Sequence, residues 1–355
     1  MKIEIKKGAY VVFKLLNISY KDLMKRYLTY LLILIILCFS IPVLFTRSFQ
    51  KAKETNVAQN IEEDIPPITY DYKKYKTVKL YHAKTKKVEE LQFDEYLYGV
   101  VSSEMPANFE YEALKAQAVV ARTYTLYKIV HNSKKHENAD ICDDSTCCQA
   151  WISKENRLAK WKEDKQTEYW NKIVKAVNST QGKMITYNNE PINAFFHANS
   201  GGETEAPINV WGGSGYPYLQ SVSTVGEDAY SQYASNVTVT QKQFIETIKK
   251  EHSDFEIDFS KKDCIKVKEY TEGNRVKTIQ VGNLSLSGVE IRTLFGLRSA
   301  NFKVTMEGKN IKFEVTGYGH GVGMSQTGAD SLAKQGKTYE EIIHHFYTGV
   351  EIKDI

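Results

Sequence analysis

A run of nineteen uncharged residues, from Tyr27 to Phe45, constrains this chain more than any other feature of its sequence. A helix needs about 20 mostly apolar residues to cross a bilayer, so the run is long enough. The residues before it carry seven Lys or Arg and two acids, and the positive-inside rule keeps such a tail in the cytoplasm. A cleavable signal peptide is the alternative, but no small-residue cleavage motif follows the run. We expect an uncleaved, single-pass anchor in the cell membrane.

This anchor divides the chain into four predicted parts. They are a cytoplasmic basic tail over 1–26, a transmembrane helix over 27–46, a stalk over 47–75 and an extracytoplasmic domain over 76–355. The stalk is polar and has little periodicity. Beyond the tail the chain has 40 Lys or Arg against 41 Asp or Glu. The net charge of +4 therefore reflects membrane topology and does not indicate nucleic-acid binding.

Short strand patterns alternate irregularly with helical patterns along the domain. Because a doubly wound sheet needs regular strand–helix alternation, this mixture predicts an α+β domain, in which we expect a substrate cleft. The expected strands cover 78–81, 183–187, 192–197 and 277–281, and the expected helices cover 111–131, 169–179, 241–251 and 339–347. Segments 301–306 and 310–316, joined through Gly308, predict a β-hairpin.

One acid and two cations lie close together in the sequence between residues 101 and 128. Pro106 disfavours a helical conformation at the residue before it, so we expect Glu104 on irregular backbone, where its side chain can face a cleft. The helix that follows places Lys115 and Arg122 two turns apart and nearly on one face. This group suits a polar substrate. The alternative is a surface helix with scattered charges and an acid near its start, where the helix dipole favours anions.

Three of the five cysteines cluster with a histidine, as His136, Cys142, Cys147 and Cys148. A disulfide would leave one thiol unpaired, and adjacent cysteines bridge each other only with strain. Four soft or borderline ligands within thirteen residues suit a tetrahedral Zn²⁺ ion. We expect a structural zinc ion, because four protein ligands close its coordination sphere. With one ligand absent, an open catalytic zinc becomes possible.

Two glycine-rich stretches contain histidines. His197 precedes a polar Gly-rich turn, and His320 stands among four glycines in GYGHGVG, so that backbone can approach a ligand closely. Trp and Tyr on the Gly- and Pro-rich loops between them suit sugar rings, with loop packing as the alternative. No Lys-Ser/Thr pair follows the glycines, which argues against a phosphate-binding loop. We count His197, His320 and Gln326 as candidate substrate-binding residues.

The domain resembles the stage II sporulation protein D family in seven motifs: SSEMP, EALKAQAVVARTY, FFHANSGGETE, VWGG, PYLQSV, LSGVEIRTLFGLRSANF and GHGVGMSQTGA. The resemblance covers residues 77–355. It implies a membrane-anchored lytic transglycosylase that acts on peptidoglycan between mother cell and forespore during engulfment. The implied substrate is glycan already stripped of its stem peptides by an amidase, stage II sporulation protein P. The membrane protein stage II sporulation protein M is implied as a further partner.

The resemblance also implies roles by position, with Glu104 as the catalytic acid, Lys115 and Arg122 as substrate-contacting cations, and Tyr218 as a cleft tyrosine. Two departures affect individual substrate contacts. Gln220 stands where members of the family commonly have Lys, and Thr327 stands where they commonly have Tyr. The Cys/His cluster is not general to the family.

A single carboxylate is enough for the implied reaction. Hydrolytic glycosidases need two, whereas in a lytic transglycosylase the C6 hydroxyl of N-acetylmuramic acid replaces water as the nucleophile. In this hypothesis Glu104 protonates the glycosidic oxygen and then accepts the proton of that hydroxyl, which closes a 1,6-anhydro ring. The pKa of such an acid must be raised, by burial or by a nearby carboxylate.

Two other functions compete with this hypothesis. One is a glycan-binding module that activates a cell-wall amidase and has no catalysis of its own. The other is a zinc amidase, which is weakened because a Cys₃His set lacks the open position that metallo-hydrolysis needs.

Overall fold

The computed structural model of the chain describes residues 25, 28–29, 75–132 and 135–355. The predicted basic tail, transmembrane helix and stalk thus lie outside the described residues, except at Lys25, Leu28, Thr29 and Tyr75. In the described part of the chain, no helix combines the length and the apolar character needed to cross a membrane. The described residues from Tyr75 onward belong to one compact unit, which corresponds to the predicted domain.

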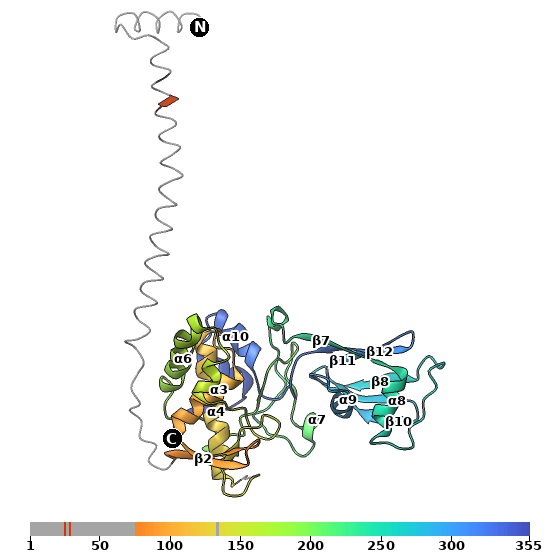
Figure 1. Ribbon diagram of the computed structural model, residues 1–355, viewed down its shortest axis with the longest axis horizontal. Helices are drawn as coiled ribbons and strands as arrows, with labels where there is room; N and C mark the ends of the chain where they lie inside the picture. Colours follow the sequence, from red (N-terminus) through yellow and green to blue (C-terminus); the bar gives the residue numbers. More distant parts are fainter. Residues whose placement is uncertain (1–24, 26–27, 30–74, 133–134) are drawn as a thin grey trace, which may run out of the picture. The chain divides into compact units, whose positions relative to one another are not determined.

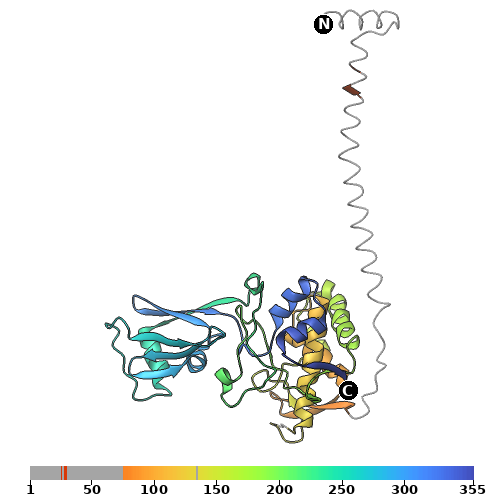
Figure 2. The same cartoon turned by 180° about the vertical axis from the view of Figure 1, so that it is seen from behind.

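This unit is mixed α+β, as predicted (Figure 1). It has two hydrophobic cores. The first core surrounds α4 (Tyr111–Val130), whose small and apolar residues are buried along most of its length. A helix that is apolar on every side belongs inside a protein. Against it pack α3 (Phe93–Glu104), α6 (Glu163–Asn178), α10 (Gln326–Lys334) and α11 (Tyr339–Phe346). Figure 2 shows the blue C-terminal helices against the orange and yellow ones from behind.

Two small sheets pack against these helices. One has the order β2-β1-β3, with β1 (Thr77–His82), β2 (Lys87–Gln92) and β3 (Ile141–Cys142). The other has the order β14-β4-β5, with β4 (Lys183–Tyr187), β5 (Glu190–Pro191) and β14 (Glu351–Asp354). The short helix α5 (Lys154–Leu158) lies against α3 and α6.

The second core lies between two further antiparallel sheets and two helices. The sheets are β11-β12-β7, with β7 (Ala234–Thr240), β11 (Phe302–Glu307) and β12 (Asn310–Thr316), and β10-β9-β8, with β8 (Ile265–Tyr270), β9 (Val276–Val281) and β10 (Leu284–Ser287). The helices are α8 (Gln241–Lys249) and α9 (Gly288–Phe295). The ring of Phe295 lies 5.0 Å from that of Phe244 and 5.1 Å from that of Phe313, so aromatic packing joins the helices to the sheet.

A pair of very short parallel strands brings the two glycine-rich motifs together. In it β6 (Phe196–His197) pairs with β13 (Met324–Ser325), and Asn199 forms an isolated bridge with Tyr318. The loops between these strands and the second core carry the short helix α7 (Ile208–Trp211) and a 3₁₀ helix, η1 (Glu227–Ala229). The two motifs predicted to contribute to one site therefore lie side by side.

Most of the predicted elements are confirmed. All four predicted helices form, although α6 begins at Glu163, six residues before its predicted start. The hairpin of β11 and β12 also forms, and Gly308 supplies the positive φ of 62° at its turn. The predicted strand over 192–197 is wrong except at its last two residues. Its apolar pattern arises because Ile192 and Ala194 are buried in irregular backbone.

Candidate active site

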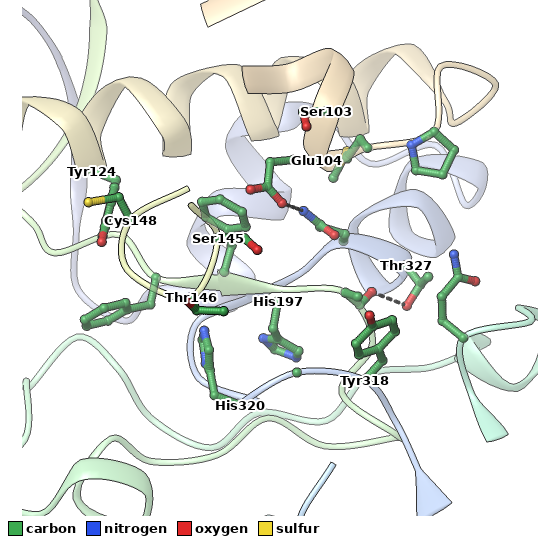
Figure 3. Close-up of a pocket in the computed structure, with 18 of the residues that line it drawn as sticks. Ser103, Glu104, Tyr124, Ser145, Thr146, Cys148, His197, Tyr318, His320 and Thr327 are labelled. Carbon is green, nitrogen blue, oxygen red and sulfur yellow. Dashed lines mark hydrogen bonds between the residues drawn. The ribbon is translucent and has the colours of Figure 1, made fainter. Parts of the chain in front are cut away.

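A cavity of about 1550 Å³ is lined by residues from both cores (Figure 3). This exceeds the volume of a typical small-molecule pocket, about 300–1000 Å³, and suits a segment of a polymer. Six of the predicted site residues line the cavity: Glu104, His197, His320, Gln326, Cys147 and Cys148. Lys115, Arg122, Tyr218, His136 and Cys142 do not line it.

Glu104 is the last residue of α3, and the prediction that it lies on irregular backbone is wrong. Pro106 constrains only the residue before it, so Met105 is extended (φ −114°, ψ 142°) while the helix continues through Glu104, further than expected. Oε1 of Glu104 accepts a hydrogen bond from the amide of Ala150 at 2.6 Å, and Oε2 accepts one from Nε2 of Gln326 at 3.3 Å. Burial outweighs these bonds and raises the pKa of Glu104 to about 7, as an acid catalyst requires.

Arg122, which is predicted to contact substrate, lies in the protein interior and does not line the cavity. Its side chain is fully buried, and its guanidinium donates to the carbonyls of Lys183 and Val177 and lies 3.6 Å from the Asp94 carboxylate. Because α4 is central in the first core, the part of its surface that carries Arg122 meets protein and not the cavity. Arg122 therefore joins α3, α4, α6 and β4.

Lys115 also lies away from the cavity. Its ammonium is 2.9 Å from Glu112 and 4.4 Å from the ring centre of Tyr339, at the start of α11. Glu112 accepts a hydrogen bond from the amide of Tyr339 as well. Lys115 is predicted to contact substrate, and in the structure its side chain takes part in the packing of α4 against α11.

Tyr218, the predicted cleft tyrosine, is buried in the first core. Its hydroxyl accepts a hydrogen bond from the amide of Asn193 at 3.0 Å, and its ring packs against those of Tyr187 and Tyr216. Gln220, two residues on, is exposed and donates to the carbonyl of Pro217. In this structure Tyr218 supports the loop and does not reach the cavity.

The two predicted histidines lie side by side in the cavity wall, with ring centres 5.7 Å apart. Val322 contacts both: its carbonyl lies 3.1 Å from Nδ1 of His197, and its amide donates to Nδ1 of His320 at 3.0 Å. These bonds assign the proton of His197 to Nδ1 and that of His320 to Nε2. Burial lowers the pKa of His197 to about 4 and also lowers that of His320, so both imidazoles are neutral at neutral pH.

The Cys/His cluster adjoins the cavity through Cys147 and Cys148. His136, Cys142 and Cys147 bring three ligand atoms within 4.8 Å of one another. Sγ of Cys147 lies 3.7 Å from Nε2 of His136 and 3.7 Å from Sγ of Cys148. With Zn–S bonds of about 2.3 Å, sulfur ligands at the corners of a tetrahedron are about 3.8 Å apart. The three residues thus fit a metal, whereas Cys148 lies beside their group and not within it.

The alternative of a disulfide is not realised. Among the described residues, Cys142, Cys147, Cys148 and Cys264 all have free thiols.

Glu227, in η1, is a buried carboxylate that the sequence did not reveal. It accepts six hydrogen bonds from the glycine-rich turn, the loop before η1 and the start of α10: from Ser200 (amide and hydroxyl), Gly202, Thr224, Ser325 and Thr327. Burial alone would raise the pKa of Glu227, but these bonds prevail and lower it to about 2. Thr327, in the position where the family commonly has Tyr, is one of these donors.

The cavity wall also contains cations and exposed aromatics that were not predicted individually. The cations are Lys128, Lys135, Arg157 and Arg292. Trp211 and Tyr318 are 51% and 44% exposed where they line the cavity. The quoted motifs VWGG and GYGHGVG contain these two aromatics, so their glycine-rich setting was the available indication. No spacing pattern connects the four cations.

Known proteins resemble this chain over most of its length. A family model, SpoIID, described as Stage II sporulation protein, matches residues 81–187. Stage II sporulation protein D of Bacillus subtilis (strain 168) is 35% identical over 339 residues, which cover 93% of this chain and 96% of that protein. Stage II sporulation protein D of Bacillus amyloliquefaciens is 36% identical over 280 residues, covering 78% and 79%. The amidase enhancer of Bacillus subtilis (strain 168) is 30% identical over 311 residues, covering 72% of this chain and 40% of that protein.

Proposed function

Because the chain belongs to the stage II sporulation protein D family, we propose that it is a peptidoglycan lytic transglycosylase. It cleaves the β-1,4 bond between N-acetylmuramic acid and N-acetylglucosamine in peptide-stripped glycan and leaves 1,6-anhydro ends. One observation carries the proposal: Glu104 has a pKa of about 7 and is the single carboxylate among the described residues that line the cavity. A hydrolytic glycosidase would need a second carboxylate about 5–10 Å away.

The reaction needs one group that first gives and then takes a proton. Protonated Glu104 donates its proton to the glycosidic oxygen, the bond to C1 of N-acetylmuramic acid breaks, and N-acetylglucosamine leaves with a free 4-hydroxyl. The C6 hydroxyl then attacks C1 and returns its proton to the Glu104 carboxylate. The acid is thus regenerated without water. A pKa near the working pH suits both steps.

Sugar rings are held by the exposed aromatics in this proposal. Trp211 packs against Phe195 and His320, at ring-centre distances of 4.7 and 5.1 Å, while half of its surface stays exposed. A fixed indole offers a flat apolar face at little cost in conformational entropy. The neutral His320 supplies a polar group beside it, and Gln326 orients the acid.

We also propose a zinc ion held by His136, Cys142 and Cys147, with Cys148 beside it. The mutual approach of their three ligand atoms within 4.8 Å and the 3.7 Å separation of Cys147 Sγ from His136 Nε2 support this. Zinc bound there would order the loop over 143–148, whose residues form part of the cavity wall. No step of the glycan reaction requires it.

The proposal extends to location and partners. The chain acts as a single-pass protein of the cell membrane, with its domain in the space between mother cell and forespore. Stage II sporulation protein P supplies the stripped glycan, and stage II sporulation protein M is a further partner. The motifs in sequence and the 35% identity to a sporulation protein support this context.

A second function deserves testing because an amidase enhancer is 30% identical over 72% of this chain. In that case the cavity binds glycan and the domain activates an amidase without cleaving glycan itself. The raised pKa of Glu104 favours catalysis, since a purely binding cavity has no need of a buried acid.

The test is product analysis of peptide-stripped glycan strands incubated with the purified full chain. Glu104→Gln is compared with the parent, and Glu95→Gln, which removes an exposed carboxylate from the same helix, is the matched control. We expect fragments ending in 1,6-anhydro-N-acetylmuramic acid from the parent and the control, and none from Glu104→Gln. Fragments heavier by one water would make the protein a hydrolase. Glycan binding without any fragments would leave the activating function.

A further inference from the structure

Arg292 is a cation of the cavity wall that has no anionic partner in the described part of the chain. It lies in α9, which begins with a Ser287 cap and ends at Gly296 in the left-handed conformation. Nε of Arg292 donates to the carbonyl of Leu297 at 3.3 Å. This bond holds the side chain at its inner nitrogen, so the two outer nitrogens, which form the fork of the guanidinium, remain for a ligand.

The surroundings of Arg292 are those of a desolvated cation. Burial lowers its pKa, and the one group that raises it is the phenol of Tyr318. Its charge in turn lowers the pKa of His197 and His320, so the guanidinium acts on the same wall of the cavity as the histidines. A cation withdrawn from water without a counter-charge is unfavourable unless a ligand supplies the anion.

The other three cations of the wall contact an aromatic ring or a carbonyl, and burial lowers the pKa of Arg157 as it does that of Arg292. Lys128 lies over the ring of Tyr124, Lys135 donates to the carbonyl of Cys147, and Arg157 lies over the ring of Trp161. Together with Arg292 they face a single carboxylate, Glu104, among the described lining residues. Because the raised pKa keeps Glu104 partly protonated at neutral pH, the cavity as a whole is positive and attracts anions.

We propose that Arg292 binds the lactyl carboxylate of N-acetylmuramic acid and so selects glycan from which the stem peptide has been removed. This inference rests on the proposed function. In intact peptidoglycan the lactyl carboxyl is part of an uncharged amide, and amidase cleavage converts it into a carboxylate. A guanidinium fork binds a carboxylate with two parallel hydrogen bonds, which an amide cannot accept in the same way.

The position of Arg292 supports this assignment. Tyr318, 44% exposed, lies next to it in the wall, so one aromatic face and one cation are available to a single acidic sugar. Arg298 lies on the same side, 5.1 Å from the ring of Tyr318, but does not line the cavity. The chain thus offers a matched arginine for comparison.

Equilibrium binding tests the proposal independently of catalysis. The purified full chain carries Glu104→Gln, so that glycan is not consumed, and its affinity is measured for two ligands. One is peptide-stripped glycan with free lactyl carboxylates, and the other is the same glycan with these groups converted to methylamides. We expect the free carboxylates to bind about 10- to 100-fold tighter.

Arg292→Gln should reduce the affinity for the free-carboxylate glycan to that for the methylamide glycan and leave the latter unchanged. Arg292→Lys should retain part of the preference, because it keeps the charge and loses the fork. Arg298→Gln should behave as the parent. Thermal melting of each variant establishes that it is folded.

Three results would overturn the proposal. The first is that Arg292→Gln keeps the full preference for free carboxylates. The second is that Arg292→Gln loses affinity equally for both ligands. The third is that the parent binds both ligands equally. A third ligand is glycan that still carries its stem peptides. If the parent binds it as tightly as the stripped strand, and Arg292→Gln loses this affinity, then Arg292 binds a carboxylate of the peptide. Cleavage by the protein without Glu104→Gln is scored separately, so a missing transglycosylase activity does not alter these comparisons.

Discussion

The side-chain amide of Gln326 donates a hydrogen bond to Oε2 of Glu104, with 3.3 Å between the two atoms. The bond connects the first residue of α10 to the last residue of α3. Gln326 is itself buried and lies 3.5 Å from the side-chain oxygen of Gln117 in α4. The orientation of the proposed acid therefore depends on a residue far along the chain.

This bond leads to a prediction about pH. An amide donor stabilises the ionised form of Glu104 and lowers its pKa, against the larger effect of burial. Because the protonated acid starts the reaction, cleavage should decline as the pH rises through about 7. Gln326→Met removes the donor, raises the pKa and should move this decline upward by about half a unit to one unit. Rates of anhydro-end formation between pH 5 and 9 measure the decline in the parent and its shift in Gln326→Met.

The control for this experiment is Gln335→Met, at the C-terminal end of the same helix, where the amide donates to Ser331. Its pH profile should match that of the parent. If cleavage by Gln326→Met declined at the same pH as cleavage by the parent, the loss of activity at high pH would not be due to ionisation of Glu104.

Glu227→Gln should destabilise the protein. An amide in place of the carboxylate presents two donors to a site that already consists of donors, and the bonds in the parent lower the pKa from 4.5 to about 2. We expect the free energy of unfolding to fall by about 2–4 kcal/mol at pH 7. A carboxylate with a depressed pKa stabilises the fold above pH 4.5, and this stabilisation is lost as the pH falls toward 2. The difference from the parent should thus narrow between pH 5 and 3.

Denaturant titrations at several pH values measure this difference. Asp228→Asn, which changes the exposed neighbouring residue, should unfold like the parent. A constant difference across the pH range would assign the loss to packing and not to the charge of Glu227.

Removal of metal should destabilise the native chain if the Cys/His cluster binds zinc. A ligand at 100 times its dissociation constant stabilises a protein by about 2.7 kcal/mol, so a chelator should lower the melting temperature by several degrees. Cys142→Ser should lower the melting temperature even without chelator, and added chelator should then have no further effect. Cys264→Ser, at a buried cysteine in contact with Met306 and remote from the cluster, should keep that response. The measurement is the melting temperature of each protein with and without chelator. If the melting temperature of the parent does not change, the protein contains no structural zinc.

The sequence predicted those parts of the fold whose determinants are local. Helix α4 and the hairpin at Gly308 follow from periodicity and from one glycine with positive φ. Glu104 could be singled out because it stands two residues before Pro106 in the motif SSEMP. These features need only neighbours within a few residues.

The contacts of single side chains could not be predicted in the same way. The spacing of Lys115 and Arg122 fixes their directions from α4, but which protein or cavity surface they meet depends on how other helices pack. Glu227 belongs to no motif, because the five residues that donate its six hydrogen bonds come from three separate segments. Arg292 lies in the motif LSGVEIRTLFGLRSANF, but only the structure reveals that it lines the cavity without an anionic partner among the described residues.

Glu227 also has a consequence for biosynthesis. The carboxylate becomes fully bonded only when Ser325 and Thr327 reach it, and Gln326 between them completes the surroundings of Glu104. Translation must therefore pass residue 327 before the proposed catalytic site can assemble. We expect a chain interrupted earlier, by nonsense mutation or ribosome stalling, to lack the proposed glycan cleavage.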